Sequence, residues 1–102
     1  MTKYESLYII STTIGDEAIA EKIAKFSGIV ESNGGSIVSV DTDSWGKRKL
    51  AYPINDLNEG YYVLVDFEAD PALPAELERR FGIDENILRS IVVRHAEKKT
   101  AE

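Results

Sequence analysis

Three consecutive cations, Lys47, Arg48 and Lys49, are the residues of this sequence that most clearly indicate a chemistry. Lysine and arginine neutralise backbone phosphates without reading bases, so such a run suits a small phosphate-contacting patch. Gly46 precedes the run, and the apolar segment 50–54 (LAYPI) follows it. The structural alternative is a charged strand edge that deters pairing with other strands. That alternative explains one or two cations better than it explains three.

Catalytic and metal-binding patterns are weak by comparison. The chain has one histidine, His95, and no cysteine, which removes disulfides, thiolate metal sites and a cysteine nucleophile together. The carboxylates that could bind a divalent ion match no metal-loop spacing, and a solvated face is the commoner explanation for them. We therefore expect no catalytic residue, no metal, no cofactor and no small-molecule substrate.

Length and composition limit the remaining classes of protein. The 102 residues suffice for one domain, and 43% hydrophobic with 29% charged residues is typical of a packed globular chain. The longest apolar run, 61–65, is far too short to cross a bilayer, so we expect no membrane partner. The net charge of −6 argues against wholesale wrapping of a nucleic acid, although cations gather at 47–49 and at 89–99.

The hydrophobic pattern predicts six secondary-structure elements. Strands are expected over 3–11, 36–45 (continuing over 47–52 beyond Gly46), 61–68 and 87–95, and a loop over 55–60. A first helix is expected to begin after a cap at Thr13 or Asp16 and to end at 33–35, and a second helix is expected over 70–81. This order is that of an α+β, ferredoxin-like split βαβ fold, in which two helices cover one face of a four-stranded antiparallel sheet. We expect a single domain over 1–95 and a polar tail over 96–102.

Alternation along the strands predicts which side chains lie on the uncovered face of this sheet. Leu7 and Ile9 share a side with the charges of the first strand, and Tyr62 and Leu64 share a side with the acids of the third. Because those two strands are central in this topology, the four residues would expose roughly a few hundred Å², a patch size typical of interaction sites. Scattered surface apolar residues are the ordinary alternative. The pattern leaves the facing of the second and fourth strands open.

The third strand also invites comparison with RNA-recognition domains, which share this order of elements. Their third-strand motif is K/R-G-F/Y-G/A-F-V-x-F/Y, and its aromatic side chains stack on bases. The segment 59–66 (EGYYVLVD) matches it well only at Gly60 and Tyr61. A stacking platform for single-stranded RNA is therefore weakly supported.

The segment 46–54 (GKRKLAYPI) resembles the signature G-x-[RK]-[RK]-L-A-Y-P-I of the bacterial small-subunit ribosomal protein six family. The resemblance extends nearly from end to end, and residues 3–5, 60–62 and 86–89 also match the family's pattern. It implies a structural, non-enzymatic component of the small ribosomal subunit, associated with the ribosome in the cytoplasm.

The resemblance further implies binding to small-subunit ribosomal RNA together with ribosomal protein eighteen. A basic partner would supply much of the phosphate neutralisation that this acidic chain lacks. We therefore expect the cations Lys3, Lys47, Arg48, Lys49 and Arg94 to approach ribosomal RNA phosphates, and the open-face residues Leu7, Ile9, Tyr62 and Leu64 to bind the protein partner. The fold alone also permits a ferredoxin-like small-molecule-sensing or regulatory domain unrelated to the ribosome.

Overall fold

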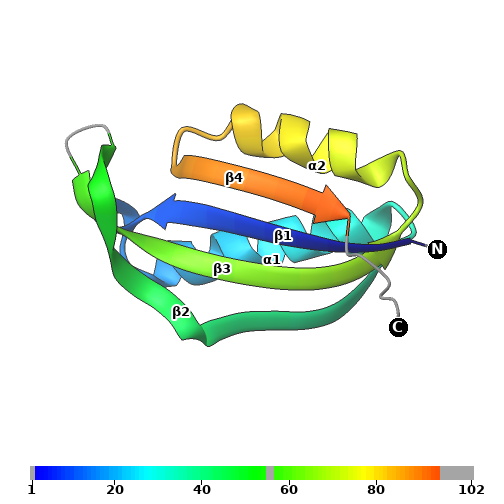
Figure 1. The fold of residues 1–102 in the computed structure, drawn as a ribbon, viewed down its shortest axis with the longest axis horizontal. Coiled ribbons are helices and arrows are strands. Elements are labelled where there is room, and N and C mark those ends of the chain that lie inside the picture. Colours follow the sequence, from blue (N-terminus) through cyan, green and yellow to red (C-terminus); the bar gives the residue numbers. More distant parts are fainter. Residues whose placement is uncertain (1, 55–56, 95–102) are drawn as a thin grey trace.

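The computed structural model describes residues 2–54 and 57–94, without the side chains of 43–45 and 51–53. Its elements, in chain order, are β1 (Thr2–Ser11), a 3₁₀ turn (Thr12–Ile14), α1 (Asp16–Ser32), β2 (Ser36–Ile54), β3 (Leu57–Ala69), α2 (Leu73–Gly82) and β4 (Ile87–Arg94) (Figure 1). The expected order of elements is confirmed. His95 and the expected tail over 96–102 lie outside the described residues.

The four strands form one antiparallel sheet in the order β2-β3-β1-β4. The two central strands are therefore β1 and β3, as the topology predicted. Figure 1 views this sheet from its uncovered side, with α1 behind the strands. Both helices contribute buried side chains to a single core cluster on the covered side. The ferredoxin-like fold class is thereby confirmed.

The facing of the central strands agrees with the prediction from alternation. The even-numbered β1 residues Tyr4, Ser6, Tyr8 and Ile10 are buried towards the helices. In β3, Val63, Val65 and Phe67 are buried in the same cluster. The odd-numbered β1 residues and the even-numbered β3 residues therefore occupy the uncovered face.

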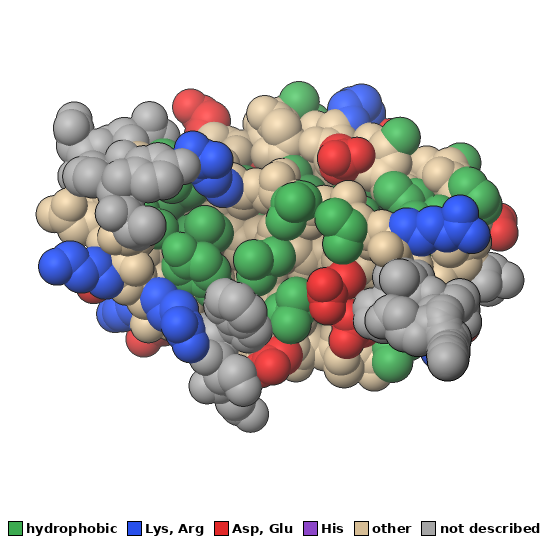
Figure 2. Space-filling model, in the orientation of Figure 1, with side chains coloured by type: hydrophobic (Ala, Val, Ile, Leu, Met, Phe, Trp, Pro, Cys, Tyr) green, Lys and Arg blue, Asp and Glu red, His purple; other side chains and the backbone are tan. Residues whose placement is uncertain are grey.

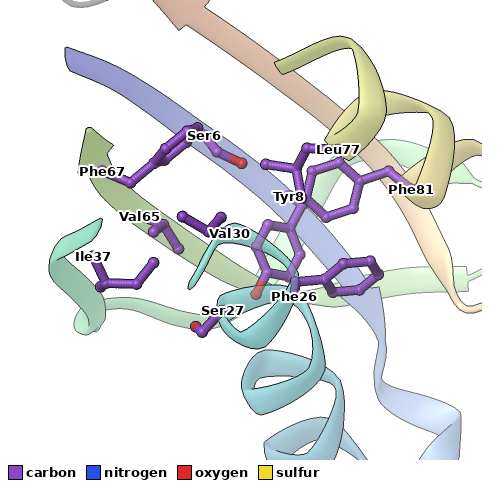
Figure 3. A pocket seen from close by; sticks show the side chains of 10 residues that line it. All are labelled: Ser6, Tyr8, Phe26, Ser27, Val30, Ile37, Val65, Phe67, Leu77 and Phe81. Atoms are coloured by element: carbon purple, nitrogen blue, oxygen red, sulfur yellow. The ribbon is translucent and has the colours of Figure 1, made fainter. Parts of the chain in front are cut away.

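Aromatic rings hold the two layers together. Phe26 of α1 and Phe81 of α2 have ring centroids 4.6 Å apart, and Tyr8 of β1 lies 4.8 Å from Phe81. Burial raises the pKa of Tyr8 above its usual value. A void of about 10 Å³ remains in this core, and Ser6 and Tyr8 are among the residues that line it (Figure 3). The hydroxyl oxygens of these two residues have no hydrogen-bond partner within the described part of the chain.

The hairpin that joins β2 to β3 is longer than the sequence predicts. Residues 57–60 belong to β3 instead of a loop, and Lys49 pairs with Glu59 while Arg48 pairs with Gly60. The expectation of a loop over 57–60 is therefore wrong, because strand pairing overrides the weak strand propensity of Asn and Gly. The expected continuation of β2 beyond Gly46 is confirmed. Gly46 adopts φ 53, next to a shift in the β2–β3 register.

Candidate partner-binding and RNA-binding surfaces

Apolar side chains cross the middle of the uncovered sheet face in register. Leu7 of β1 lies directly between Leu64 of β3 and Ile91 of β4. Together with Tyr62 and Val93 these residues form what we call the open-face patch: Leu7, Tyr62, Leu64, Ile91 and Val93. Figure 2 shows hydrophobic side chains gathered over this central part of the sheet. Because neither helix covers this face, the patch is available to another molecule.

The members of the open-face patch differ in their exposure. Ile91 and Val93 are 54% and 42% exposed, whereas Leu7, Tyr62 and Leu64 are half-buried. The sequence pattern could not assign Ile91 and Val93 to a face, because residues 91–93 are all apolar. The cross-strand pairs Leu7–Ile91 and Glu5–Val93 assign them to the open face. The β4 residues are thus the most accessible part of a patch first inferred from β1 and β3.

Ile9 does not belong to the exposed part of this surface. It is only 8% exposed, yet it lies outside the main core cluster. A Cβ on Gly60 would meet Ile9 Cγ2 at 2.3 Å, Leu50 Cδ2 at 3.4 Å and Leu88 Cδ1 at 3.7 Å. These apolar groups converge on the bare backbone of Gly60 and bury one another. The expectation that Ile9 is exposed is therefore wrong: the side chain forms a small second core on the open side.

The three consecutive cations lie near the hairpin end of the sheet, and all three are exposed. Lys47, Arg48 and Lys49 pair with Tyr61, Gly60 and Glu59 of β3. Since neighbouring strand residues point to opposite sides, Arg48 shares the open side with Leu50, while Lys47 and Lys49 point to the other side. The run therefore presents positive charge on both sides of the hairpin rather than on one flat surface.

Arg89 adds a cation that the sequence pattern did not single out for this site. It is exposed and lies opposite Ile9, on the open side of β4. Figure 2 shows Lys and Arg side chains around the hairpin end of the apolar patch. Arg89 and Arg48 lie far apart along the chain. Only the pairing between strands places both of them on the open side of the sheet near the hairpin.

Lys3 and Arg94 are exposed at the opposite end of the sheet. Lys3 pairs with Glu68 and Arg94 pairs with Tyr4. The pairs Lys3–Glu68 and Arg48–Gly60 are eight residues apart along β3, a separation of about 27 Å at the rise of an antiparallel strand. The structure therefore divides the five expected RNA-binding cations into two separate groups.

Metal sites and membrane-spanning helices are absent from the part of the chain that the structure describes. Within 2–54 and 57–94, no group of three or more His, Cys, Asp or Glu side chains could hold a metal ion. No helix among these residues is long and apolar enough to cross a membrane. The geometry does provide an apolar patch on the open face and two separate groups of exposed cations.

The fold defines a class: a ferredoxin-like α+β domain whose two helices pack on one face of the sheet and leave the other face uncovered. A family model described as ribosomal protein S6 matches residues 3–94. The chain belongs to this ribosomal protein S6 family, so it is a structural protein of the small ribosomal subunit rather than an enzyme, and it works with the ribosome in the cytoplasm.

Individual relatives agree with this assignment. The small ribosomal subunit protein bS6 of Clostridium novyi (strain NT) is 50% identical over 93 residues, which cover 91% of this chain and 96% of the relative. The protein of the same name from Clostridium perfringens (strain SM101 / Type A) is 47% identical over 94 residues, 92% of this chain and 97% of the relative. The crystal structure of 30S ribosomal protein S6 from Thermotoga maritima superimposes with a TM-score of 0.86 at 30% identity, covering 92% of this chain and 87% of that one.

Proposed function

We propose that this chain binds small-subunit ribosomal RNA together with ribosomal protein eighteen, and that the open-face patch is where the protein partner docks. The observation that carries this proposal is the apolar row Leu64–Leu7–Ile91 on a sheet face that the chain's own helices leave uncovered. Accessible apolar side chains that adjoin one another on a single face mark interaction sites in monomers. Ile9 supports the patch from the second core beside it rather than touching the partner.

The RNA contacts are assigned to the cations at the two ends of the sheet. Lys47, Arg48 and Lys49 form one contact at the hairpin, and Lys3 with Arg94 forms a second at the other end. All five side chains are exposed, as phosphate-binding side chains must be. Because the chain as a whole carries a net charge of −6, these five cations are too few to hold RNA firmly on their own. This favours joint binding with a basic partner.

Docking is tested by replacing Leu64 with Asp in the full chain and measuring co-purification with ribosomal protein eighteen. We expect binding to be abolished, because a carboxylate in the middle of an apolar interface is desolvated without a partner. Ile83→Asp is the matched control: Ile83 is also exposed, at 68%, but it follows α2, outside the patch. Equal capture of the Leu64→Asp and Ile83→Asp proteins would contradict the proposed docking surface.

RNA contact is tested by the salt dependence with which the protein pair binds its ribosomal RNA. Replacing Lys47, Arg48 and Lys49 with Gln should flatten the slope of log K against log salt by up to about one unit for each phosphate that is no longer neutralised. Lys25→Gln, at an exposed cation of α1, is the control and should leave the slope unchanged. If the triple variant kept the full slope, these cations would serve only to protect the strand edge.

A further inference from the structure

Carboxylates border the open-face patch on the side away from the hairpin. Glu5 of β1 lies directly opposite Asp66 of β3, and both share the open face with Leu7 and Leu64. Like charges directly opposite on neighbouring strands repel each other and destabilise a sheet. Glu68 lies two residues beyond Asp66, and Lys3 is the one cation in the sequences of β1 and β3. Arg94 of β4 pairs with Tyr4 and therefore points to the covered side, so Lys3 is the one cation of the central strands beside these three carboxylates.

The carboxylate of Asp66 is only partly satisfied in the free chain. Its Oδ2 accepts a hydrogen bond of 3.2 Å from Ser39 Oγ. Its Oδ1 is buried and has no hydrogen-bond partner among the described residues. Asp66 also lines a groove of about 190 Å³ with Lys3, Tyr4, Val38 and Phe67, but the ion pairs of the described residues do not include one between Lys3 and Asp66. A carboxylate oxygen that is buried without a donor leaves the negative charge of Asp66 poorly compensated, so a cation that approaches from the open side of the sheet would be favoured.

We propose that Glu5 and Asp66 accept a cationic side chain of the protein partner, most favourably an arginine, next to the apolar side chains that cover Leu7 and Leu64. This inference rests on the docking function proposed above and deepens it by naming the chemistry of the partner. A guanidinium presents donors in a planar fork, which can satisfy two carboxylates at once. It would end the Glu5–Asp66 repulsion by placing a positive charge between the two carboxylates. Charge complementarity thus selects a basic partner segment.

The spacing on the sheet also restricts where that cation lies in the partner. Glu5 and Leu7 are two residues apart on the same side of β1, about 7 Å at the rise of a strand. Asp66 and Leu64 have the same relation on β3. The cation must therefore lie within about one side-chain length of the apolar contact. The acidic side and the hairpin cations at the other end of the patch then fix the direction in which the partner segment crosses the sheet.

The test is the dissociation constant of the full chain with purified ribosomal protein eighteen, measured at several salt concentrations. The double variant Glu5→Gln/Asp66→Asn should raise the dissociation constant at least tenfold and flatten its salt dependence. The double variant Glu17→Gln/Glu21→Gln is the matched control, since it removes the same charge from exposed positions of α1. The control should change affinity less than twofold. Urea unfolding should show the Glu5→Gln/Asp66→Asn chain to be at least as stable as the parent, because a repulsion has been removed.

Two further results would overturn this inference alone, and a third outcome identifies failure of the docking function instead. If the Glu5→Gln/Asp66→Asn protein binds like its control while Leu64→Asp abolishes binding, docking stands and the cation acceptor is wrong. If Leu64→Asp also leaves binding intact, the docking function itself has failed. A Lys98→Gln/Lys99→Gln variant should bind unchanged. Tighter binding by that variant would show that the chain's own cations already occupy the carboxylates, and would also overturn the proposal.

Discussion

On the helix-covered face of the sheet, Tyr8, Val63 and Phe67 are at most 1% exposed, whereas Ile91 and Val93 on the opposite face are 54% and 42% exposed. Both faces are built from the same strands and carry apolar side chains at alternate positions. On the covered face those side chains stabilise the fold, because they are buried against α1 and α2. The open face leaves the corresponding apolar area for another molecule. Apolar content therefore does not separate core from interface here; the position of the helices does.

The largest expected difference between the two faces is in the free energy of unfolding after one side chain is truncated on each. Phe81→Ala should lower the free energy of unfolding by about 3–5 kcal/mol, because it removes a ring that packs on Tyr8 and Phe26 and leaves a cavity. Ile91→Ala should lower it by less than about 0.5 kcal/mol, since that side chain is mostly in water. Urea denaturation measures both. Similar losses for the two variants would show that the open face also carries the fold.

The small second core around Ile9 is the one part of the open face that is buried, and a substitution at Gly60 tests its packing. Gly60→Ala should destabilise the chain by about 1–3 kcal/mol, because its Cβ would overlap Ile9 Cγ2 at 2.3 Å. Gly28→Ala is the matched control: a Cβ there meets nothing within 4 Å, inside α1. That change should stabilise the chain by about 0.5–1 kcal/mol through helix propensity. A neutral Gly60→Ala variant would mean that Ile9 is free to move out towards solvent.

The helical layer itself depends on a partly buried ion pair, and its removal should have an effect of intermediate size. Lys22 Nζ donates to Asp84 Oδ2 at 2.6 Å, and the Asn86 N–H donates to Asp84 Oδ1 at 2.9 Å, so α1 is tied to the segment that joins α2 to β4. Asp84→Asn should cost about 1–2 kcal/mol, because these hydrogen bonds involve a charged acceptor. Asp16→Asn, at an exposed acid in the first turn of α1, is the control and should cost less.

The same carboxylate predicts a pH dependence of stability. Burial alone would raise the pKa of Asp84, but the hydrogen bonds from Lys22 and Asn86 outweigh burial and lower it below its usual value. A folded-state pKa below the unfolded one gives stability that is present above the unfolded pKa and is lost as pH falls through the folded one. We expect the Asp84→Asn protein to lose less stability than the parent on acidification. Parallel pH profiles for the two proteins would contradict this role.

The smallest expected effect is a gain of stability on the covered face. Ser6 is 1% exposed, its hydroxyl lacks a hydrogen-bond partner among the described residues, and it lines the void of about 10 Å³. Ser6→Ala should therefore raise the free energy of unfolding by up to about 1 kcal/mol, because an unsatisfied buried hydroxyl is removed. Ser90→Ala is the control: Ser90 is an exposed residue of β4, so its substitution should be neutral. A loss of stability in the Ser6→Ala protein would show that this hydroxyl is satisfied in solution.

Local patterns predicted much of the fold correctly. Alternation along β1 assigned Tyr4, Ser6, Tyr8 and Ile10 to the helices, and the structure buries all four. The signature over 46–54 indicated the ribosomal protein S6 family, and a family model matches residues 3–94. These inferences succeeded because side-chain alternation and a long signature are both properties of contiguous sequence.

The candidate site was predicted less completely, for reasons that concern strand pairing. Ile9 shares a side with Leu7, yet only the approach of Gly60, Leu50 and Leu88 reveals that Ile9 is buried. Residues 57–60 have poor strand propensity, and they become strand by pairing with β2. The two groups of cations were expected as a single set because their separation along β3 is not visible before the register is known.

The amino-acid sequence by itself determined the order of elements, the covered face of the two central strands and the family, because periodicity and motifs are encoded in neighbouring residues. Tertiary structure alone decided that Ile91 and Val93 join Leu7 and Leu64, that Ile9 is withdrawn, and that Glu5 opposes Asp66. Each of these facts follows from the register between strands that are distant in the chain. Cross-strand neighbours are set by hydrogen bonding over the whole sheet, and local sequence does not carry that information.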